Sequence, residues 1–427
     1  MTVGVGKEMW ELVAELYPLC RSITGDGVRA TLEIIGRQID LEVHEVPTGT
    51  QVFDWTVPRE WNLHDAWVDD PTGRRVIDLR DSNLHVVSYS TPVDQTMPLA
   101  ELRQHLFTLP EHPDWVPYRT SYYSESWGLC ASQRLVDSLP DGPYRVRIDA
   151  TLAEGSLTYG EHFLGGETQE EVLISCHVCH PSLANDNLSG IVVATQLARR
   201  LAETRPRYSY RFLFIPGTIG SITWLALNEH HLDRIRHGLV LACVGDPGPL
   251  TYKRSRRGDA GIDRAITHVL ARSARQHTVT DFSPYGYDER QYCSPGFNLP
   301  VGSLSRTPYA QYPQYHTSAD DLDLVRPEAM ADTLEVCWET LRVLEADRRY
   351  RNLSPKGEPQ LGRRGLYGTI GGRSDAEQRQ MAMLWVLNLS DTDHSLLDIA
   401  DRSGLPFPLI AETAATLQDA GLLAAAS

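Results

Sequence analysis

Along most of the chain, short apolar runs typical of strands alternate with segments in which apolar residues recur at helical spacing. Short apolar runs with β-branched residues predict strands at 170–175 and 208–216. Between them, residues 190–203 carry apolar side chains at helical spacing, and the same spacing predicts helices at 261–275 and 327–349. Alternating units of this length are typical of an α/β domain, in which a mixed or mostly parallel sheet is flanked by helices.

Other regions depart from this alternation. The first residues predict a helix ending near Pro18, a helix at 28–38 and a strand at 41–47. Residues 51–127 are rich in Trp, Tyr, Pro and Asp and predict an inserted, mainly β domain. A linker rich in Gly, Pro and Arg at 352–373 precedes a helix–turn–helix pattern. We therefore expect three domains: a discontinuous α/β domain at 1–50 and 128–351, the β-rich insertion at 51–127 and a winged-helix-like domain at 374–427.

The insertion holds many of the aromatic residues of the chain: Trp55, Trp61, Trp67, Trp115, Tyr118, Tyr122, Tyr123 and Trp127. Most of them are expected to form a small core within the insertion. The alternative is that the insertion covers a site as a lid or forms a contact between copies of the chain, which leaves a homo-oligomer open.

The net charge of the chain argues against two classes of binding partner. Among 427 residues, 40 are Lys or Arg and 56 are Asp or Glu, so the formal net charge is −16. Nucleic acids and anionic membranes require a basic face, and neither is expected as the main partner. Residues 376–427 contain seven acidic residues and two arginines, which argues against DNA binding by the helix–turn–helix unit. We expect this unit to pack against the rest of the chain or another subunit.

Two features indicate a cytoplasmic protein. The first residues lack the basic-then-apolar order of a signal peptide, and no apolar run approaches the ~18–20 residues that a membrane span needs. The seven cysteines are odd in number and scattered, which favours a reduced protein over a disulfide-bonded one.

The segment SCHVCHPSLANDNLSG, at 175–190, concentrates residues that can bind a metal. It lies between a predicted buried strand and a helix, where ligand sites of open α/β sheets are found. His177, His180 and Asp186 offer imidazole nitrogen and carboxylate oxygen, which suit zinc or a similar divalent ion. A polar loop with hydrogen-bonded histidines and a helix cap is an equally good interpretation of this segment alone.

Three other segments carry candidate residues. His316 precedes the acidic sequence TSADDLD, whose Ser, Thr and Asp residues are explained by helix capping, whereas the histidine is not. Asp288 and Glu289 lie together in a loop rich in Gly, Pro and Tyr, where a surface ion-pair cluster is the simpler interpretation. Asp246 follows a predicted strand and is by itself only a turn residue.

Taken in order, HPSLANDNLSG, YDERQYCSPGFNLPVG and YHTSADDLD resemble the three late signatures of zinc-dependent aminopeptidases, a family that includes glutaminyl cyclases. This resemblance covers roughly residues 140–350. The phrases FDWTVPREW, SNLHVVSYS and RTSYYSESWG are similar to a narrower group of aminopeptidase-like proteins, with an inserted β domain and a C-terminal winged helix. That group is often associated with polysaccharide or secondary-metabolite biosynthesis, and its likeness extends over nearly the whole chain.

The resemblance implies one zinc ion per chain and these candidate ligands: His177, His180, Asp186, Asp246 and His316. Either of the first two histidines would be the first ligand. Asp186 would be the central carboxylate, although the neighbouring Asn185 is an alternative match. The family has an aspartate two residues after the first histidine, where this chain has Cys179, so the carboxylate that would orient the imidazole is missing.

A second departure affects the expected general base. The family has two glutamates after the strand at 208–216, the first a base and the second a ligand, but this chain has Gly217 and Thr218. General base catalysis typically contributes about 10²–10⁴-fold. Three explanations remain open: the position has been altered, Asp288 or Glu289 supplies the base, or the protein no longer hydrolyses a substrate. The leading hypothesis is a zinc-dependent amidohydrolase for a small peptide or amide conjugate, and its rival is a non-hydrolytic binding or scaffold protein.

Overall fold

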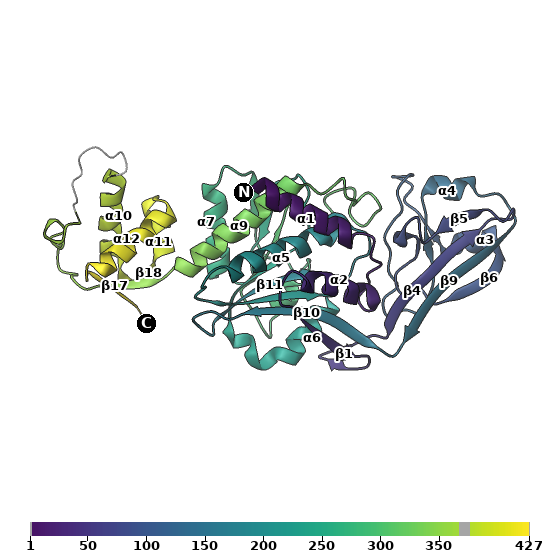
Figure 1. The fold of residues 1–427 in the computed structure, drawn as a ribbon, viewed down its shortest axis with the longest axis horizontal. Helices are drawn as coiled ribbons and strands as arrows, with labels where there is room; N and C mark the ends of the chain where they lie inside the picture. The colour runs from purple at the N-terminus through teal and green to yellow at the C-terminus, as the bar shows by residue number, and fades with distance from the viewer. Residues whose placement is uncertain (1, 367–375, 427) are drawn as a thin grey trace. The chain divides into compact units, whose positions relative to one another are not determined.

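The computed structural model describes residues 2–366 and 376–426 (Figure 1). It divides into two compact units, which we describe separately. The first consists of Met1–Asp263 and Ser273–Cys337, and the second of Arg264–Arg272 and Trp338–Ser427.

An eight-stranded mixed sheet forms the centre of the first unit. In spatial order its strands are β1 (Glu42–Pro47), β10 (Ser156–Leu164), β12 (Ser209–Ile215), β11 (Glu171–His177), β13 (Ile235–Leu241), β16 (Val301–Ser305), β14 (Leu250–Lys253) and β15 (His277–Thr280). The four strands from β12 to β16 are parallel, whereas β10 and β14 run antiparallel to their neighbours in this central group. Every residue of β11 is buried, because both faces of a central parallel strand are covered. The expected mixed α/β sheet is confirmed.

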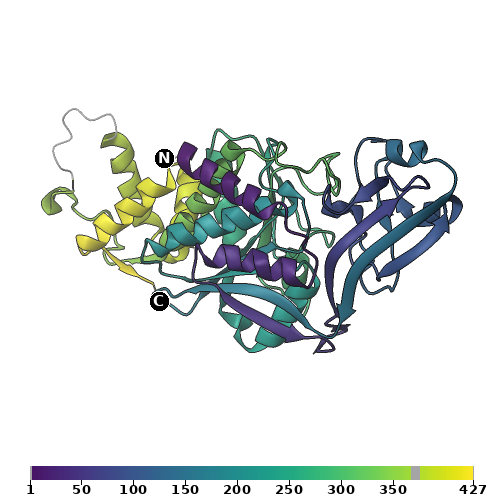
Figure 2. The same ribbon diagram turned by 45° about the vertical axis from the view of Figure 1, so that its right-hand side comes forward.

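Helices cover both faces of this sheet. Helices α1 (Thr2–Leu16), α2 (Asp26–Gly36) and α5 (Ser189–Ala202) lie on one side, and α6 (Ile219–Asn228) lies on the other (Figures 1 and 2). Helix α1 ends two residues before Pro18, as its sequence predicts. The remaining α-helices that lie wholly in this unit are α3 (Leu99–Leu102), α4 (Gln133–Ser138) and α8 (Glu289–Tyr292), and a π-helical turn, η3 (Ala184–Leu188), precedes α5.

The insertion is built on a second sheet, in the order β5 (Arg75–Asp78), β4 (Glu60–Asp69), β9 (Pro143–Ala153) and β6 (Val93–Pro98). All its pairings are antiparallel. Two short pairs accompany it: β2 (Gln51–Val52) with β3 (Trp55–Thr56), and β7 (Leu106–Phe107) with β8 (Leu129–Cys130). Short 3₁₀ turns include η1 (Asn83–His85), η2 (Arg103–His105) and η4 (Glu229–Arg234).

Strand β9 differs from the sequence-based expectation. The expected α/β domain at 128–351 includes this strand, but it pairs with β4 and β6 of the insertion, and only the following β10 enters the eight-stranded sheet. The second sheet therefore extends to Ala153, beyond the segment 51–127. Alternation reports which face of a strand is buried and carries no information about which sheet it joins.

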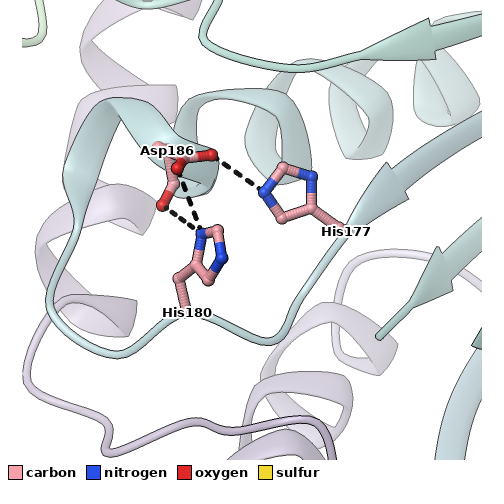
Figure 3. Close-up of side chains that lie close together, drawn as sticks. All are labelled: His177, His180 and Asp186. Atoms are coloured by element: carbon pink, nitrogen blue, oxygen red, sulfur yellow. Dashed lines mark hydrogen bonds and ion pairs between the residues drawn. The ribbon is translucent and has the colours of Figure 1, made fainter. Parts of the chain in front are cut away.

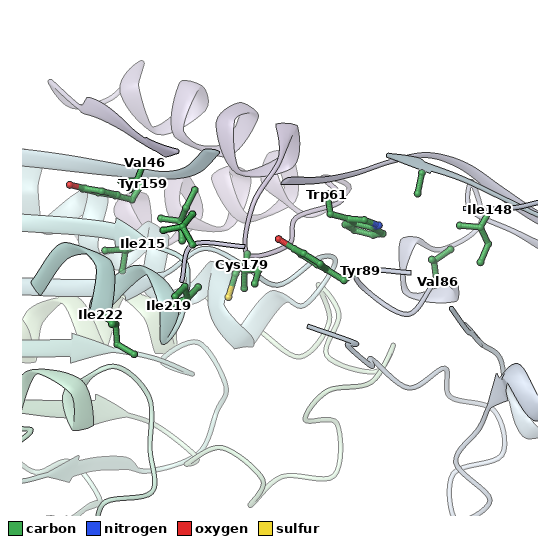
Figure 4. Packing of buried hydrophobic residues seen from close by; sticks show 14 of the residues in the cluster. Val46, Trp61, Val86, Tyr89, Ile148, Tyr159, Cys179, Ile215, Ile219 and Ile222 are labelled. Atoms are coloured by element: carbon green, nitrogen blue, oxygen red, sulfur yellow. The ribbon is translucent and has the colours of Figure 1, made fainter. Parts of the chain in front are cut away.

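One buried cluster joins the insertion to the α/β part. Trp61 and Tyr89 of the insertion belong to the same cluster as Cys179, Ile215 and Ile219 beside the central sheet (Figure 4). The insertion therefore shares a core with the strand ends, rather than having only a core of its own. Two of its aromatic residues, Trp55 and Tyr123, are 40% and 52% exposed.

The second unit contains a small helical domain with a three-stranded sheet. Its elements are β17 (Arg349–Asn352), η5 (Gly362–Arg364), α10 (Ala376–Leu389), β18 (Asp391–Ser395), α11 (Leu396–Ser403), α12 (Phe407–Asp419) and β19 (Leu423–Ala425). The strands pair in the order β18–β17–β19. This is the winged-helix arrangement that the helix–turn–helix pattern predicts. Part of the expected linker at 352–373 lies outside the described residues.

Two long helices contribute to both units, namely α7 (Gly261–Arg272) and α9 (Pro327–Ala346). Over the described residues, no helix combines the length and the apolar character that crossing a membrane would require.

Candidate metal centre

Four segments that are distant in the sequence meet beside the carboxyl ends of the central strands. Strand β11 ends at His177, and β12 ends two residues before Gly217. The segment before α8 adds Tyr287 and Asp288, and the loop after β16 adds His316; all of these residues line one cavity. This is the edge at which open α/β sheets bind ligands.

Asp186 is the centre of the site. Its Oδ1 lies 2.9 Å from Nε2 of His177, and its Oδ2 lies 3.2 Å from Nδ1 of His180 (Figure 3). A third imidazole comes from the distant loop, where His316 Nε2 lies 3.1 Å from Asp186 Oδ2. The hydroxyl of Tyr287 donates to Asp186 Oδ1 over 3.1 Å. One fully buried carboxylate is thus surrounded by three imidazoles and a phenol.

The charges at this centre stabilise one another. Burial opposes ionisation of Asp186, but attraction to His180 and the close contacts of the three imidazoles outweigh burial and hold the pKa of this carboxyl well below its usual range. Burial also opposes the charged form of His180, yet the contact with Asp186 raises the pKa of that imidazole above its ordinary value. His316 has a lowered pKa because its burial outweighs the attraction of Asp186.

A second buried carboxylate holds the loop that carries Asp186. The backbone N–H groups of Asn185 and Asp186 donate to Asp320 over 2.6 and 3.1 Å. Burial raises the pKa of Asp320 to about 7, and the charge of Asp186 adds to this rise. In the sequence Asp320 resembles a helix-capping residue, so its role in fixing this loop is not evident before folding.

The structure distinguishes Asp186 from its alternative Asn185 as the central residue of the site. The side chain of Asn185 accepts from the backbone N–H of Gly245 and donates to Asp246, away from the imidazoles. Asp246 also accepts from the hydroxyl and backbone N–H of Thr307 and from the N–H of Gly248. It is outside the group formed by the imidazoles and Asp186. Of the five candidate ligands, His177, His180, Asp186 and His316 come together and Asp246 does not.

The two candidate bases, Asp288 and Glu289, have different surroundings. Asp288 lines the cavity, and its Oδ1 accepts from the backbone N–H of Thr218 over 2.7 Å and from the hydroxyl of Ser221 over 2.8 Å. Burial raises the pKa of Asp288, although the charge of His177 opposes this. Glu289 instead forms a buried ion pair with Lys253. Only Asp288 is placed to act on a molecule in the cavity.

The cavity beside these groups has a volume of about 260 Å³. Gly217 forms part of its wall: a Cβ added there would lie 3.5 Å from Cys179 Sγ and 3.6 Å from His177 Cβ, with no closer contact. Tyrosines continue the wall outward. The ring of Tyr287 stacks on His177 at 4.7 Å, Tyr309 contacts Tyr287, and the 68% exposed Tyr285 contacts Tyr309.

The insertion closes another side of the site. The ring of Tyr118 contacts His180 and His316 edge-on, with centroids 5.2 and 5.1 Å apart. Its backbone N–H donates to the carbonyl of His316, and the segment bearing Ser318 forms two further hydrogen bonds with Val116. The insertion therefore positions the third imidazole.

Three residues in or beside the cavity wall have unusual backbone conformations. Thr218, Cys243 and His316 have φ values of 63°, 54° and 56°, in the left-handed region that favours glycine. Non-glycine residues occupy this region at a cost of about 1–3 kcal/mol and are enriched at functional sites. For Thr218, which is β-branched, this conformation is a true outlier. The site thus lies in a strained part of the chain.

The donor set fits a zinc ion. His177, His180 and Asp186 offer ligand atoms that lie within 4.8 Å of one another, and Nε2 of His316 faces the same carboxylate. Asp186 Oδ2 and His316 Nε2 are also among the buried polar atoms without a well-formed hydrogen bond. Three imidazoles with a carboxylate satisfy the tetrahedral preference of zinc, whereas harder ions prefer oxygen ligands.

Comparisons with known proteins agree with this geometry. A family model described as a domain of unknown function, DUF4910, matches residues 10–347, and a winged helix-turn-helix model matches residues 348–425. A Clostridium acetobutylicum protein is 51% identical over 98% of this chain and 96% of its own length. Its name provisionally assigns it to polysaccharide biosynthesis and describes an aminopeptidase-like domain.

Solved structures show the same fold. A crystal structure from Clostridium acetobutylicum, provisionally named a peptidase, is 49% identical, covers 100% of this chain and 97% of its own, and has a TM-score of 0.94. A zinc aminopeptidase from Bacillus subtilis is 14% identical, with a TM-score of 0.57 over 79% of this chain and 94% of its own. The chain therefore belongs to the family described as domain of unknown function DUF4910, with an aminopeptidase-like fold and a C-terminal winged helix.

Proposed function

We propose that this protein is a zinc-dependent amidohydrolase that acts on a small peptide or amide conjugate. One observation carries the proposal: the buried carboxylate of Asp186 faces the imidazoles of His177, His180 and His316 at the inner end of a cavity. These residues would hold one zinc ion. Zinc would supply a Lewis acid that polarises an amide carbonyl and makes water more acidic.

The side chains around this centre suit the proton transfers of hydrolysis. Asp288 would accept the proton of the attacking water, since its Oδ2 is buried and has no hydrogen-bond partner. The raised pKa of Asp288 brings its proton affinity nearer to neutrality, where a general base is most effective. The hydroxyl of Tyr287, held on Asp186, would orient the central carboxylate.

The shape of the cavity supports a small substrate. About 260 Å³ is below the roughly 300–1,000 Å³ typical of drug-sized ligands, so the inner site would receive one short acyl or amine group. The exposed Tyr285 at the outer end would contact the rest of a larger conjugate. The name of the Clostridium acetobutylicum relative suggests that this conjugate belongs to polysaccharide biosynthesis.

Metal analysis tests the proposal directly. Purified protein, reconstituted with zinc and freed of loose metal, is expected to retain about one zinc ion per chain. Asp186→Asn and His316→Gln should lower zinc affinity strongly, whereas Asp323→Asn, which changes an exposed carboxylate near His316 in the sequence, should not. Failure of the native chain to retain zinc after reconstitution would remove the hydrolase function.

A second candidate function is supported by Gly217. A protein without a base at this position would bind an amide in the cavity and leave it intact. A panel of aminoacyl amides, assayed with the zinc-loaded native chain and with Gly217→Glu, separates the two functions. Turnover by the native chain that Asp288→Asn abolishes supports the amidohydrolase. Turnover that begins only with Gly217→Glu supports the binding protein.

A further inference from the structure

Arg290 lies in the cavity wall with a guanidinium group that is almost without partners. It belongs to the short helix α8 and lines the cavity together with Gly217 and His177. Its one hydrogen bond is long, 3.4 Å from Nη2 to the hydroxyl of Thr218. Its Nε–H is buried and has no acceptor. No carboxylate of the described residues lies within ion-pair distance of it.

Three other partly or fully buried arginines of this unit are well paired. Arg21 donates to three backbone carbonyls and a threonine hydroxyl. Arg211 contacts the carboxylates of Glu161 and Glu171. Arg306 donates to two carbonyls and to Asp332. Since a guanidinium carries five N–H donors, each one left unsatisfied away from water is costly. The buried Nε–H of Arg290 is such a donor, and no described residue supplies an acceptor for it.

The adjacent acids are engaged elsewhere. Glu289 is fully buried and pairs with Lys253. Asp288 uses Oδ1 for Thr218 and Ser221. The charge of Arg290 acts on Asp288 without a direct ion pair, so the donors of its guanidinium stay available to a group in the cavity.

There is room for such a group. Because residue 217 is a glycine, the cavity reaches the backbone there, and the nearest atoms to an added Cβ are Cys179 Sγ at 3.5 Å and His177 Cβ at 3.6 Å. A ligand in this space would touch Arg290 at one end and the imidazoles at the other, since all line the same cavity.

We propose that Arg290 binds a carboxylate of the substrate, so that the site selects amides with a carboxylate close to the scissile bond. A guanidinium and a carboxylate are both planar, and their two parallel hydrogen bonds give orientation as well as affinity. This inference deepens the proposed function, because it rests on the use of the cavity as a substrate site. It assigns a specificity-determining role to a residue that does not hold the metal.

Binding of two matched probes tests this role without requiring turnover. N-acetylglycine and N-acetylglycinamide have nearly the same shape and differ in charge. Titration of the full-length, zinc-loaded chain is expected to show at least about tenfold tighter binding of the acid. Arg290→Gln should abolish this preference, and Arg290→Lys should restore part of it. Arg256→Gln, which removes an exposed arginine, should leave the preference unchanged.

Each other outcome has a definite meaning. A preference for the acid that survives Arg290→Gln would show that the metal or another group binds the carboxylate, and would overturn the inference. Tighter binding of methyl phosphate than of N-acetylglycine would overturn the assignment of a carboxylate. Repeating the titration on metal-free protein separates this inference from the proposed hydrolase, because the preference is expected to persist without zinc. If Arg290 served only to position Thr218, Arg290→Gln would weaken the binding of both probes equally and leave the ratio of their affinities unchanged. That result would also overturn the inference.

Discussion

The carboxylate of Asp288 accepts a hydrogen bond of 2.7 Å from the backbone N–H of Thr218, a residue 70 positions earlier in the chain. Thr218 and Gly217 stand where zinc aminopeptidases are expected to have two glutamates. A carboxylate from a different loop thus reaches the neighbourhood that those glutamates would occupy. Its raised pKa and its unpartnered Oδ2 make it the best-placed proton acceptor among the described residues of the cavity.

The first prediction concerns Asp288→Asn. Removing a general base typically lowers kcat by about 10²–10⁴-fold, and we expect a loss in this range. KM and zinc content should change little, because the amide side chain can still accept the hydrogen bonds of Thr218 and Ser221. Steady-state kinetics together with metal analysis provide the measurement. A variant with full kcat would show that the base lies elsewhere.

The second prediction concerns the buried pair of Lys253 and Glu289, whose side chains are 13% and 0% exposed. Lys253→Met would leave Glu289 without its cation, and breaking a buried pair in this way costs about 3–5 kcal/mol of unfolding free energy. The double variant Lys253→Met with Glu289→Gln should regain most of this loss, since no buried charge remains. Urea unfolding of the native chain and the two variants would show it. Equal stability of the single and double variants would contradict the expectation.

The third prediction compares two glycines. At Gly217 an added Cβ meets only ordinary contacts, so Gly217→Ala should leave stability unchanged or raise it by up to about 1 kcal/mol. At Gly190 the Cβ would lie 2.5 Å from the carbonyl oxygen of Leu241 and from Oδ1 of Asn187. The carbonyl belongs to strand β13 and cannot move easily, so Gly190→Ala should destabilise by about 2 kcal/mol or more. Thermal unfolding distinguishes the two, and similar melting temperatures would refute this comparison.

Much of the fold could be predicted from periodicity because the central strands and helices are long and regular. Strand β11 and helix α5 lie close to their expected positions, and His177 and Asp186 could be placed near a strand end for the same reason. The pairing of β9 could not be predicted from periodicity, because the choice between two sheets depends on contacts between residues distant in the sequence. The support that Asp320 gives to Asp186 was hidden by an equally good capping interpretation.

The burial of charged side chains and their pairing with one another could not be predicted from the sequence either. Asp246 follows a strand as a ligand would, and only the structure places Thr307 and Gly248 as its donors. Arg290 appears beside two acids in the sequence, where an ion pair is the natural expectation. In the folded chain, one of these acids pairs with Lys253 instead. Which charges remain free depends on the whole fold, and such charges are the ones available to a ligand.

The last prediction concerns the contact between helix α2 and the insertion. Arg29 donates to both oxygens of Glu60 over 2.7 Å, and these hydrogen bonds hold the pKa of Glu60 at about 2. An ordinary glutamate titrates near pH 4.3. The stabilisation is therefore fully present above about pH 4.5 and is lost as pH falls toward 2, because protonation then breaks the pair.

Glu60→Gln should lower the unfolding free energy at pH 7 by about 1–2 kcal/mol, a value reduced from the full pKa shift because solvent screens the pair. The difference between native and variant should shrink as the pH is lowered from 4.5 to 2.5. Glu33→Gln, which removes the exposed partner of Arg37, should cost less than about 0.5 kcal/mol. Denaturant unfolding at a series of pH values gives both quantities. A difference that stays constant with pH would mean that Glu60 acts through packing, and not through its charge.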